Sequence, residues 1–202
     1  MDEAKIRLSP LEKELVSNAG WILTKNGILE KVMQLFGRIQ VSYREELKRF
    51  PGLPDEIVER GPKISRGEKY EGLPYLVLDY PRLFLPAQVF AIRTFFWWGN
   101  FFSITLHLAG DYAANARERI SDAYPMLSEK GYSVCIGADP WIHHFGQDHY
   151  RRVSEMDHEA FTRLIREMKF IKLAIKFELD RWDDCEAVFP ECFRTLLDLA
   201  GN

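Results

Sequence analysis

Cysteine is scarce in this chain: the 202 residues include only Cys135, Cys185 and Cys192. The odd number and the spacing match no metal-binding or disulfide framework. Cys185 and Cys192 lie seven residues apart, which places both on one side of a helix. We therefore interpret the three as free structural thiols of a cytoplasmic protein. The charged first residues, Met-Asp-Glu-Ala-Lys, also lack the apolar core of a secretory signal.

Positive charge is not in excess, and the familiar catalytic motifs are missing. The chain has 27 Lys and Arg against 30 Asp and Glu, a net charge of −3. Such a balance gives no general attraction to nucleic acid or to an anionic membrane surface. No Gly-x-Ser-x-Gly, Cys-x-x-Cys, P-loop or dinucleotide-binding glycine pattern occurs. The motifs thus identify neither an enzyme class nor a cofactor, and we expect no nucleic-acid partner.

What the chain does contain is enough apolar sequence for one ordinary domain. Hydrophobic residues make up 47% and charged residues 28%, as in globular proteins. A chain of this length buries a core without help from metals or disulfides. We expect a single α+β domain over residues 1–202, with residues 1–50 as a helical pair that packs on it.

The helical pair is predicted from caps and periodicity. Ser9-Pro10 is typical of a helix start, and Asn26-Gly27 is expected to end this first helix. In the second helix, 28–50, apolar residues recur at threes and fours. We interpret the two as antiparallel neighbours. The segment 51–72 is rich in Pro, Gly and mixed charges and is predicted to be an irregular connector.

Alternating and aromatic segments predict the sheet. Expected strands are 73–79, 89–97, 101–109, 132–136 and 171–179, and in the last of these Lys172, Ala174, Lys176 and Glu178 define a solvated face. Expected helices are 111–129, broken at Pro125, a helix after Ser154 or Asp157, and 183–199. This order predicts a mostly antiparallel sheet of about five or six strands, with a central hairpin 89–97/101–109, packed against helices.

The most informative segment is 89–110, which carries one charge, at Arg93, and seven aromatic rings. Its length approaches that of a membrane span, but Gly99-Asn100 in the middle and its Phe, Trp, Thr and Ile content favour a hairpin. We expect no membrane association. A two-residue turn at Gly99-Asn100 pairs Trp97 with Phe102 and Arg93 with Leu106.

This register divides the hairpin side chains between two faces. Arg93 falls on the core face and needs a carboxylate partner, for which Asp79 and Asp111 are the candidates. The opposite face carries no charge; its members are Phe90, Ile92, Thr94, Phe96, Trp98, Phe101, Ser103, Thr105 and His107. Burial under the helical pair or the 51–72 connector, a homo-oligomer interface, or a ligand cleft would each account for this face. The candidate ligand-binding residues are Arg93, Thr94, Phe96, Trp98, Phe101, Thr105 and His107.

The segment 137–149 holds three of the five histidines. Imidazoles and carboxylates bind Zn²⁺, Fe²⁺ or Mn²⁺, and the candidate ligands are His143, His149 and Asp139. Adjacent His143 and His144 would point to opposite faces of a strand, however, and no His-Glu-x-x-His pattern is present. Structural histidines in an aromatic loop are the favoured interpretation.

Together these patterns predict a cytoplasmic binding protein. The uncharged aromatic face would serve self-association, as in a homodimer, or bind a small apolar ligand. One alternative is a metal-dependent hydrolase or oxygenase that uses the His-rich segment 139–149. Another is a scaffold or regulatory domain whose aromatic face docks a partner protein.

Overall fold

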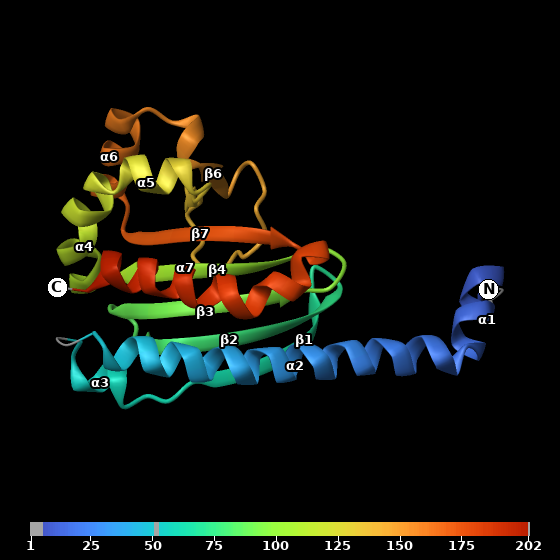
Figure 1. Ribbon diagram of the computed structural model, residues 1–202. Coiled ribbons are helices and arrows are strands. Elements are labelled where there is room, and N and C mark those ends of the chain that lie inside the picture. The colour runs from blue at the N-terminus through green and yellow to red at the C-terminus, as the bar shows by residue number, and fades with distance from the viewer. Residues whose placement is uncertain (1–5, 51–52, 202) are drawn as a thin grey trace.

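The computed structural model describes residues 6–50 and 53–201 and confirms the α+β fold (Figure 1). Seven strands form one antiparallel sheet in the order β1-β2-β3-β4-β7-β5-β6. The strands are β1 Lys63–Tyr70, β2 Leu73–Phe84, β3 Val89–Trp97, β4 Phe101–Ala109, β5 Ser133–Cys135, β6 Tyr150–Arg152 and β7 Phe170–Glu178. The strand count exceeds the expected one, and β1 lies where an irregular connector was predicted.

Helices account for most of the remaining chain. They are α1 Pro10–Ser17, α2 Ala19–Lys48, α3 Asp55–Val58, α4 Asp111–Asp122, α5 Tyr124–Glu129, α6 His158–Glu167 and α7 Cys185–Ala200, with 3₁₀ turns at Val153–Glu155 and Leu179–Asp184. The break predicted at Pro125 is confirmed, because Pro125 lies in the first turn of α5. Asp157 caps α6 by accepting a hydrogen bond from the backbone N–H of Ala160.

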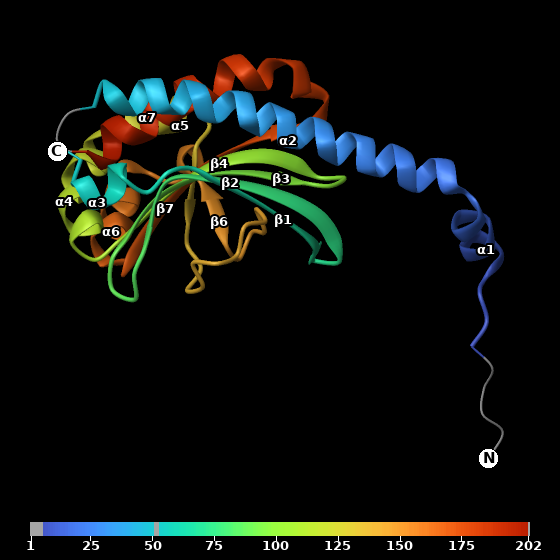
Figure 2. The ribbon, with the colours of Figure 1, turned by 90° about the horizontal axis from the view of Figure 1, so that it is seen from below.

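One face of the sheet is covered by α2 and α7, and we call it the helix face (Figure 2). The apolar stripe predicted for α2 lies against it, so that Val32, Phe36 and Ile39 are buried. The Tyr43 ring stacks on Phe193 of α7 with 3.9 Å between ring centroids. Its hydroxyl is hydrogen-bonded to Thr94 of β3 at 2.8 Å. Helix, helix and sheet thus meet at one tyrosine.

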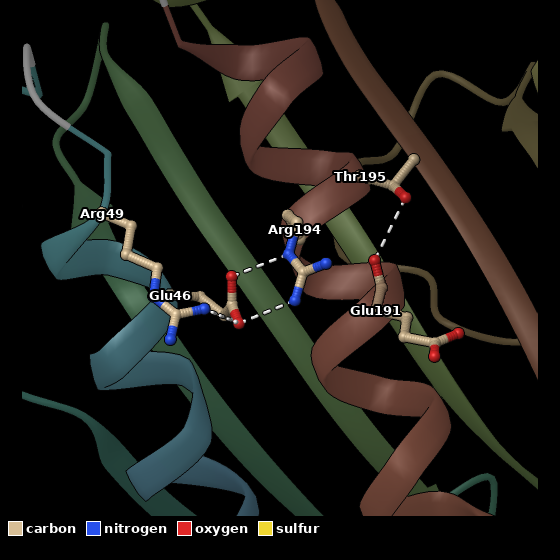
Figure 3. A network of polar contacts seen from close by, with 5 residues as sticks. All are labelled: Glu46, Arg49, Glu191, Arg194 and Thr195. Atoms are coloured by element: carbon tan, nitrogen blue, oxygen red, sulfur yellow. Dashed lines mark hydrogen bonds and ion pairs between the residues drawn. The ribbon is translucent and has the colours of Figure 1, made fainter.

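A network of ion pairs joins the two covering helices at the surface (Figure 3). The Glu46 carboxylate accepts hydrogen bonds from Nε and Nη2 of Arg194, at 2.8 and 2.9 Å. Arg49 contacts the same carboxylate at 3.3 Å. The hydrogen bond from Arg194 lowers the pKa of Glu46. This bidentate contact fixes where α2 crosses α7.

The N-terminal helices differ from the prediction. The chain bends at Asn18, whose side chain accepts a hydrogen bond from the N–H of Trp21, and α2 continues through Asn26-Gly27. A helical glycine costs only about 1 kcal/mol, which burial of the α2 stripe from Leu29 onward outweighs. The expected antiparallel pair is therefore wrong. No residue of α1 is buried, and α1 with the first turns of α2 projects past the sheet (Figures 1 and 2).

The hairpin strands have the predicted bounds, but their register is shifted by one residue. The turn contains three residues, 98–100, and the N–H of Asn100 donates to the carbonyl of Trp97 at 3.0 Å. Trp97 consequently pairs with Phe101, and Arg93 pairs with Thr105. A slip of one residue turns a whole row of side chains to the other face.

The predicted uncharged face is divided in this register: its β3 members are buried under α2, and its β4 members lie on the opposite side of the sheet. Thr94 and Phe96 are buried on the helix face. Phe101, Thr105 and His107 lie on the opposite face, in the rows that also hold Arg93. Trp98 is in the turn, where its ring meets the edge of Phe96.

The opposite face is crossed by residues 136–149, and we call it the loop face (Figure 2). The predicted solvated face of β7 is therefore wrong in part, because this loop covers it. Lys172 is 1% exposed, and Ala174 is also buried; only Lys176 and Glu178 reach the surface. In the described part of the chain no helix combines the length and the apolar character that a bilayer span requires.

Candidate functional site: a cleft beside the loop

An ion pair between two neighbouring strands forms the centre of the site. Asp79 of β2 lies directly opposite Arg93 of β3. The carboxylate accepts hydrogen bonds from Nε and Nη2 of Arg93, at 2.7 and 2.9 Å. Their side chains are only 10% and 18% exposed. The sequence left Asp79 and Asp111 as candidate partners of Arg93, and the structure selects Asp79.

His143 extends this pair into the loop. Nη1 of Arg93 lies 2.9 Å from Nε2 of His143. Burial, aided by the charges of Lys172 and Arg93, lowers the pKa of His143 to about 2. The imidazole is therefore neutral, and because a guanidinium only donates, Nε2 must be the acceptor. Among the residues that the structure describes, one N–H on each terminal nitrogen of Arg93 has no hydrogen-bond partner.

Tyr70, at the end of β1, holds the same part of the loop. Its hydroxyl oxygen accepts hydrogen bonds from the backbone N–H groups of His143 and His144, at 2.7 and 3.1 Å. Both lone pairs are then used, so that the hydroxyl hydrogen is left to donate to Nδ1 of His144 at 3.1 Å. Burial raises the pKa of Tyr70. An otherwise exposed edge strand is thereby linked to the loop.

Lys172 of β7 binds the loop from the sheet. Its Nζ donates to the carbonyl oxygens of Pro140 and Ile142, both at 2.8 Å. Burial lowers the pKa of this ammonium group to about 8. Because a buried ammonium needs strong acceptors, these two hydrogen bonds offset part of the cost of placing it there.

His107 of β4 fills the space next to Lys172. Its ring lies between Trp141 and Phe170, at centroid distances of 5.7 and 5.8 Å. Burial lowers the pKa of His107 to about 3, and the charges of Lys172 and Arg93 contribute. Neutral His107 and the cations Lys172 and Arg93 thus lie under the loop, and neutral His143 faces them from the loop itself.

The loop leaves a cleft on each side. The first, which we call the Arg93 cleft, has a volume of about 420 Å³ and lies between β1, β2, β3 and the loop. Its aromatic residues are Tyr70, Tyr75, Phe84 and Trp141, and its charged residues are Lys63, Asp79, Arg82 and Arg93. Three cations therefore face one carboxylate.

The second cleft, of about 470 Å³, lies on the β6 and β7 side of the loop. It contains Lys176, Arg151 and Arg152, together with Glu155. Its arginines are exposed on an edge strand, and Lys176 is already paired with Glu178 at 3.0 Å. Charged side chains with this much freedom lose more entropy when they bind a ligand than the fixed Arg93 does. The Arg93 cleft is the better-organised site.

Of the predicted ligand-binding residues, the structure brings Arg93, Phe101, Thr105 and His107 onto one face. Only Arg93 lines the Arg93 cleft. Thr94 and Phe96 lie on the other side of the sheet, and Trp98 is at its end. Lys63 and Tyr70 were not predicted because the segment 51–72 was interpreted as a connector, and Tyr75 lies in the predicted strand 73–79 but was not among the candidate residues. The alternation of Lys63, Ile64 and Ser65 was the available signal, and it is short.

The predicted metal ligands do not come together. Over residues 6–50 and 53–201, no three His, Cys, Asp or Glu side chains are grouped closely enough to hold a metal ion. His143 is engaged with Arg93, and the Asp139 carboxylate accepts a hydrogen bond from the N–H of Trp141 at 2.8 Å. His149 lies 3.3 Å from the carboxylate of Asp148. The three candidates are thus part of the structure of the loop.

Comparisons with known proteins give this chain no family. No family model, curated protein or solved structure matches it. Function is therefore inferred from the geometry and the charge of the cleft.

Proposed function

We propose that this protein is a binding protein whose Arg93 cleft takes a small anionic ligand with an aromatic or apolar body. The observation that carries the proposal is a cleft lined by four aromatic side chains and by an excess of positive charge, in a chain whose net charge is −3. A volume of about 420 Å³ lies within the range of small-molecule sites.

The aromatic walls supply a surface for the apolar part of the ligand. Trp141 is 51% exposed, and its ring lies 5.9 Å from that of Phe84. Tyr75 forms the opposing wall with Tyr70, whose ring it meets edge-on at 6.0 Å. Tryptophan and tyrosine at a cleft contribute large contact areas while losing little side-chain freedom.

The three cationic side chains of the cleft favour a ligand that carries a negative charge. Lys63 is exposed at the rim, and Nε of Arg82 is held by the carbonyl of Gly61 at 2.9 Å. Arg93 is already oriented by Asp79 and His143, and its uncommitted N–H groups are the donors that remain. Arginine in a fixed orientation is well suited to a carboxylate or phosphate group. Preorganisation of this kind reduces the entropy lost on binding.

The polar groups favour binding over acid–base catalysis. His143 and Tyr70 are engaged in the hydrogen bonds that hold the loop. A histidine whose pKa is about 2 is a weak general base at neutral pH.

Fluorescence titration with two probes tests the proposal. Anilinonaphthalene sulfonate is an aromatic anion, and N-phenylnaphthylamine has the same rings without the charge. We expect the anionic probe to bind the native protein more tightly than the neutral one. Lys63→Gln, which removes one exposed charge, should weaken the binding of the anionic probe about fivefold and leave the binding of the neutral probe unchanged.

Two variants locate the signal. Trp141→Ser should reduce the binding of both probes, whereas Val41→Ser, at an apolar side chain of similar exposure on α2 outside the cleft, should not. The proposal is refuted if the anionic probe gives no enhancement. It is also refuted if Val41→Ser removes the signal and Trp141→Ser leaves it unchanged.

A further inference from the structure

Residues 6–24 form an arm that touches little of the domain. They comprise α1 and the first turns of α2, and they project beyond the sheet (Figures 1 and 2). Every residue of this arm is exposed. Among the described residues, the arm holds eight of the twelve large hydrophobic side chains that are exposed: Ile6, Leu8, Leu11, Leu15, Val16, Trp21, Ile22 and Leu23.

Local hydrogen bonds give the arm a defined shape. Ser9 and Glu12 form a capping box at the start of α1, and Asn18 caps α2 at the bend. An apolar groove of about 490 Å³ runs along the inside of the bend, with Leu15, Val16 and Trp21 among its walls. The exposed side chains are thus gathered on a folded surface rather than spread along an extended tail.

The apolar area of the arm is that of a protein interface. On average, about three-fifths of each of its eight hydrophobic side chains is exposed. Because each such side chain has an area of the order of 100–200 Å², the exposed apolar area of the arm is roughly 700 Å². The largest apolar patch on a typical monomer is about 300–600 Å². A stable complex buries about 800 Å² on each partner. The arm alone therefore supplies most of what one side of an interface needs.

The charges of the arm and the scarcity of other apolar surface on the described part of the domain indicate that a second copy of this chain packs on the arm. The arm carries Arg7 and Lys13 against Glu12 and Glu14, so that two arms do not repel. A helix that binds anionic membranes is instead rich in Lys and Arg. On the described part of the domain, the other exposed large hydrophobic side chains are scattered, one each on α2, at the end of α3, after β2 and in the loop. Among the described residues, the only other apolar surface large enough to cover one arm is therefore the arm of a second copy.

We propose that the arms of two copies pack on each other about a two-fold axis and make the protein a homodimer. In such an interface the same surface is used by both partners. This proposal does not depend on the Arg93 cleft, because the arm contributes no residue to it.

Sedimentation velocity of the full chain at micromolar concentrations tests the dimer. Leu15→Glu and Leu23→Glu should sediment as monomers, with dimerisation at least tenfold weaker. Val41→Glu is the matched control, because Val41 is also on α2 and is 57% exposed, against 66% for Leu23, but lies outside the arm. It should dimerise like the wild type. Circular dichroism should show all variants to be equally helical.

Several results would overturn the proposal. One is a wild type that stays monomeric throughout this concentration range. Another is a Leu23→Glu variant that dimerises as well as Val41→Glu. Binding of a monomeric wild type to vesicles of phosphatidylcholine and phosphatidylserine would assign the arm to a membrane surface instead.

Discussion

Mild acid should destabilise this protein through two buried histidines, His107 under the loop and His143 within it. The pKa is lowered to about 3 for His107 and to about 2 for His143, both below the ordinary value of 6.5. As the pH falls below 6.5, the unfolded chain takes up protons that the folded chain refuses. The contribution to stability is therefore complete above pH 6.5 and is lost progressively as the pH falls toward the two folded-state values.

The size of the effect follows from these pKa values. A titrating site of this kind loses about 1.4 kcal/mol for each pH unit below 6.5. At pH 5, the two histidines together should have removed about 4 kcal/mol of unfolding free energy. Domains of this size have about 5–15 kcal/mol in total, so the loss is easily measured.

Urea unfolding of the wild type and of His107→Phe, from about pH 7.5 to pH 5, measures this loss. The His107 ring lies between Trp141 and Phe170 and, in the described part of the chain, makes no hydrogen bond, so a phenylalanine ring fits in its place. We expect the variant to lose about 2 kcal/mol less than the wild type over this range. If the two proteins lost the same unfolding free energy over this pH range, a neutral, buried His107 would be refuted.

Two further substitutions test the polar groups that hold the site. Lys172→Met removes both hydrogen bonds to the loop and should cost about 2–3 kcal/mol and speed amide exchange in 138–149. The pKa of Lys172 is lowered from 10.5 to about 8 in the folded protein. The stability of the wild type relative to this variant should therefore increase as the pH is raised from about 8 to 10.5. A constant difference in stability would contradict the burial of a charged Lys172. Asp79→Asn leaves the Arg93 guanidinium without a carboxylate and should cost about 3 kcal/mol in urea unfolding, whereas Asp148→Asn, at a carboxylate 79% exposed, should change stability by less than about 0.5 kcal/mol. A similar cost for both would exclude a strong Asp79–Arg93 pair.

The sequence predicted the two hairpin strands to the residue but not their register. Aromatic and β-branched residues on both sides of Gly99-Asn100 identify the strands. The same dipeptide suits a two-residue or a three-residue turn, and only contacts with the rest of the domain choose between them. Phe102 shows the choice, because it pairs with Phe96 and meets Phe36 of α2 only in the observed register, whereas a two-residue turn would place it beside Trp97 on the opposite face.

The cleft could not be predicted, because its walls come from segments with weak local patterns. Edge strand β1 carries Lys63, Arg66, Glu68 and Lys69, and charged edge residues resemble those of a loop. The loop 136–149 has no regular period at all. Its position is set by Lys172, Tyr70 and Arg93, which lie far from it in sequence, so no local pattern records their proximity.

Burial is the main cause of the acid sensitivity, and the charges that add to it are also those of the proposed preference for anions. Arg93 and Lys172 place two positive charges under the loop, and Asp79 is the carboxylate paired there. After burial, these two charges are the largest causes that lower the pKa of His143. An anion bound in the Arg93 cleft would offset them and make protonation of His143 less unfavourable. A ligand of the proposed class should therefore bind more tightly as the pH falls toward the folded-state pKa of His143, for as long as the protein stays folded.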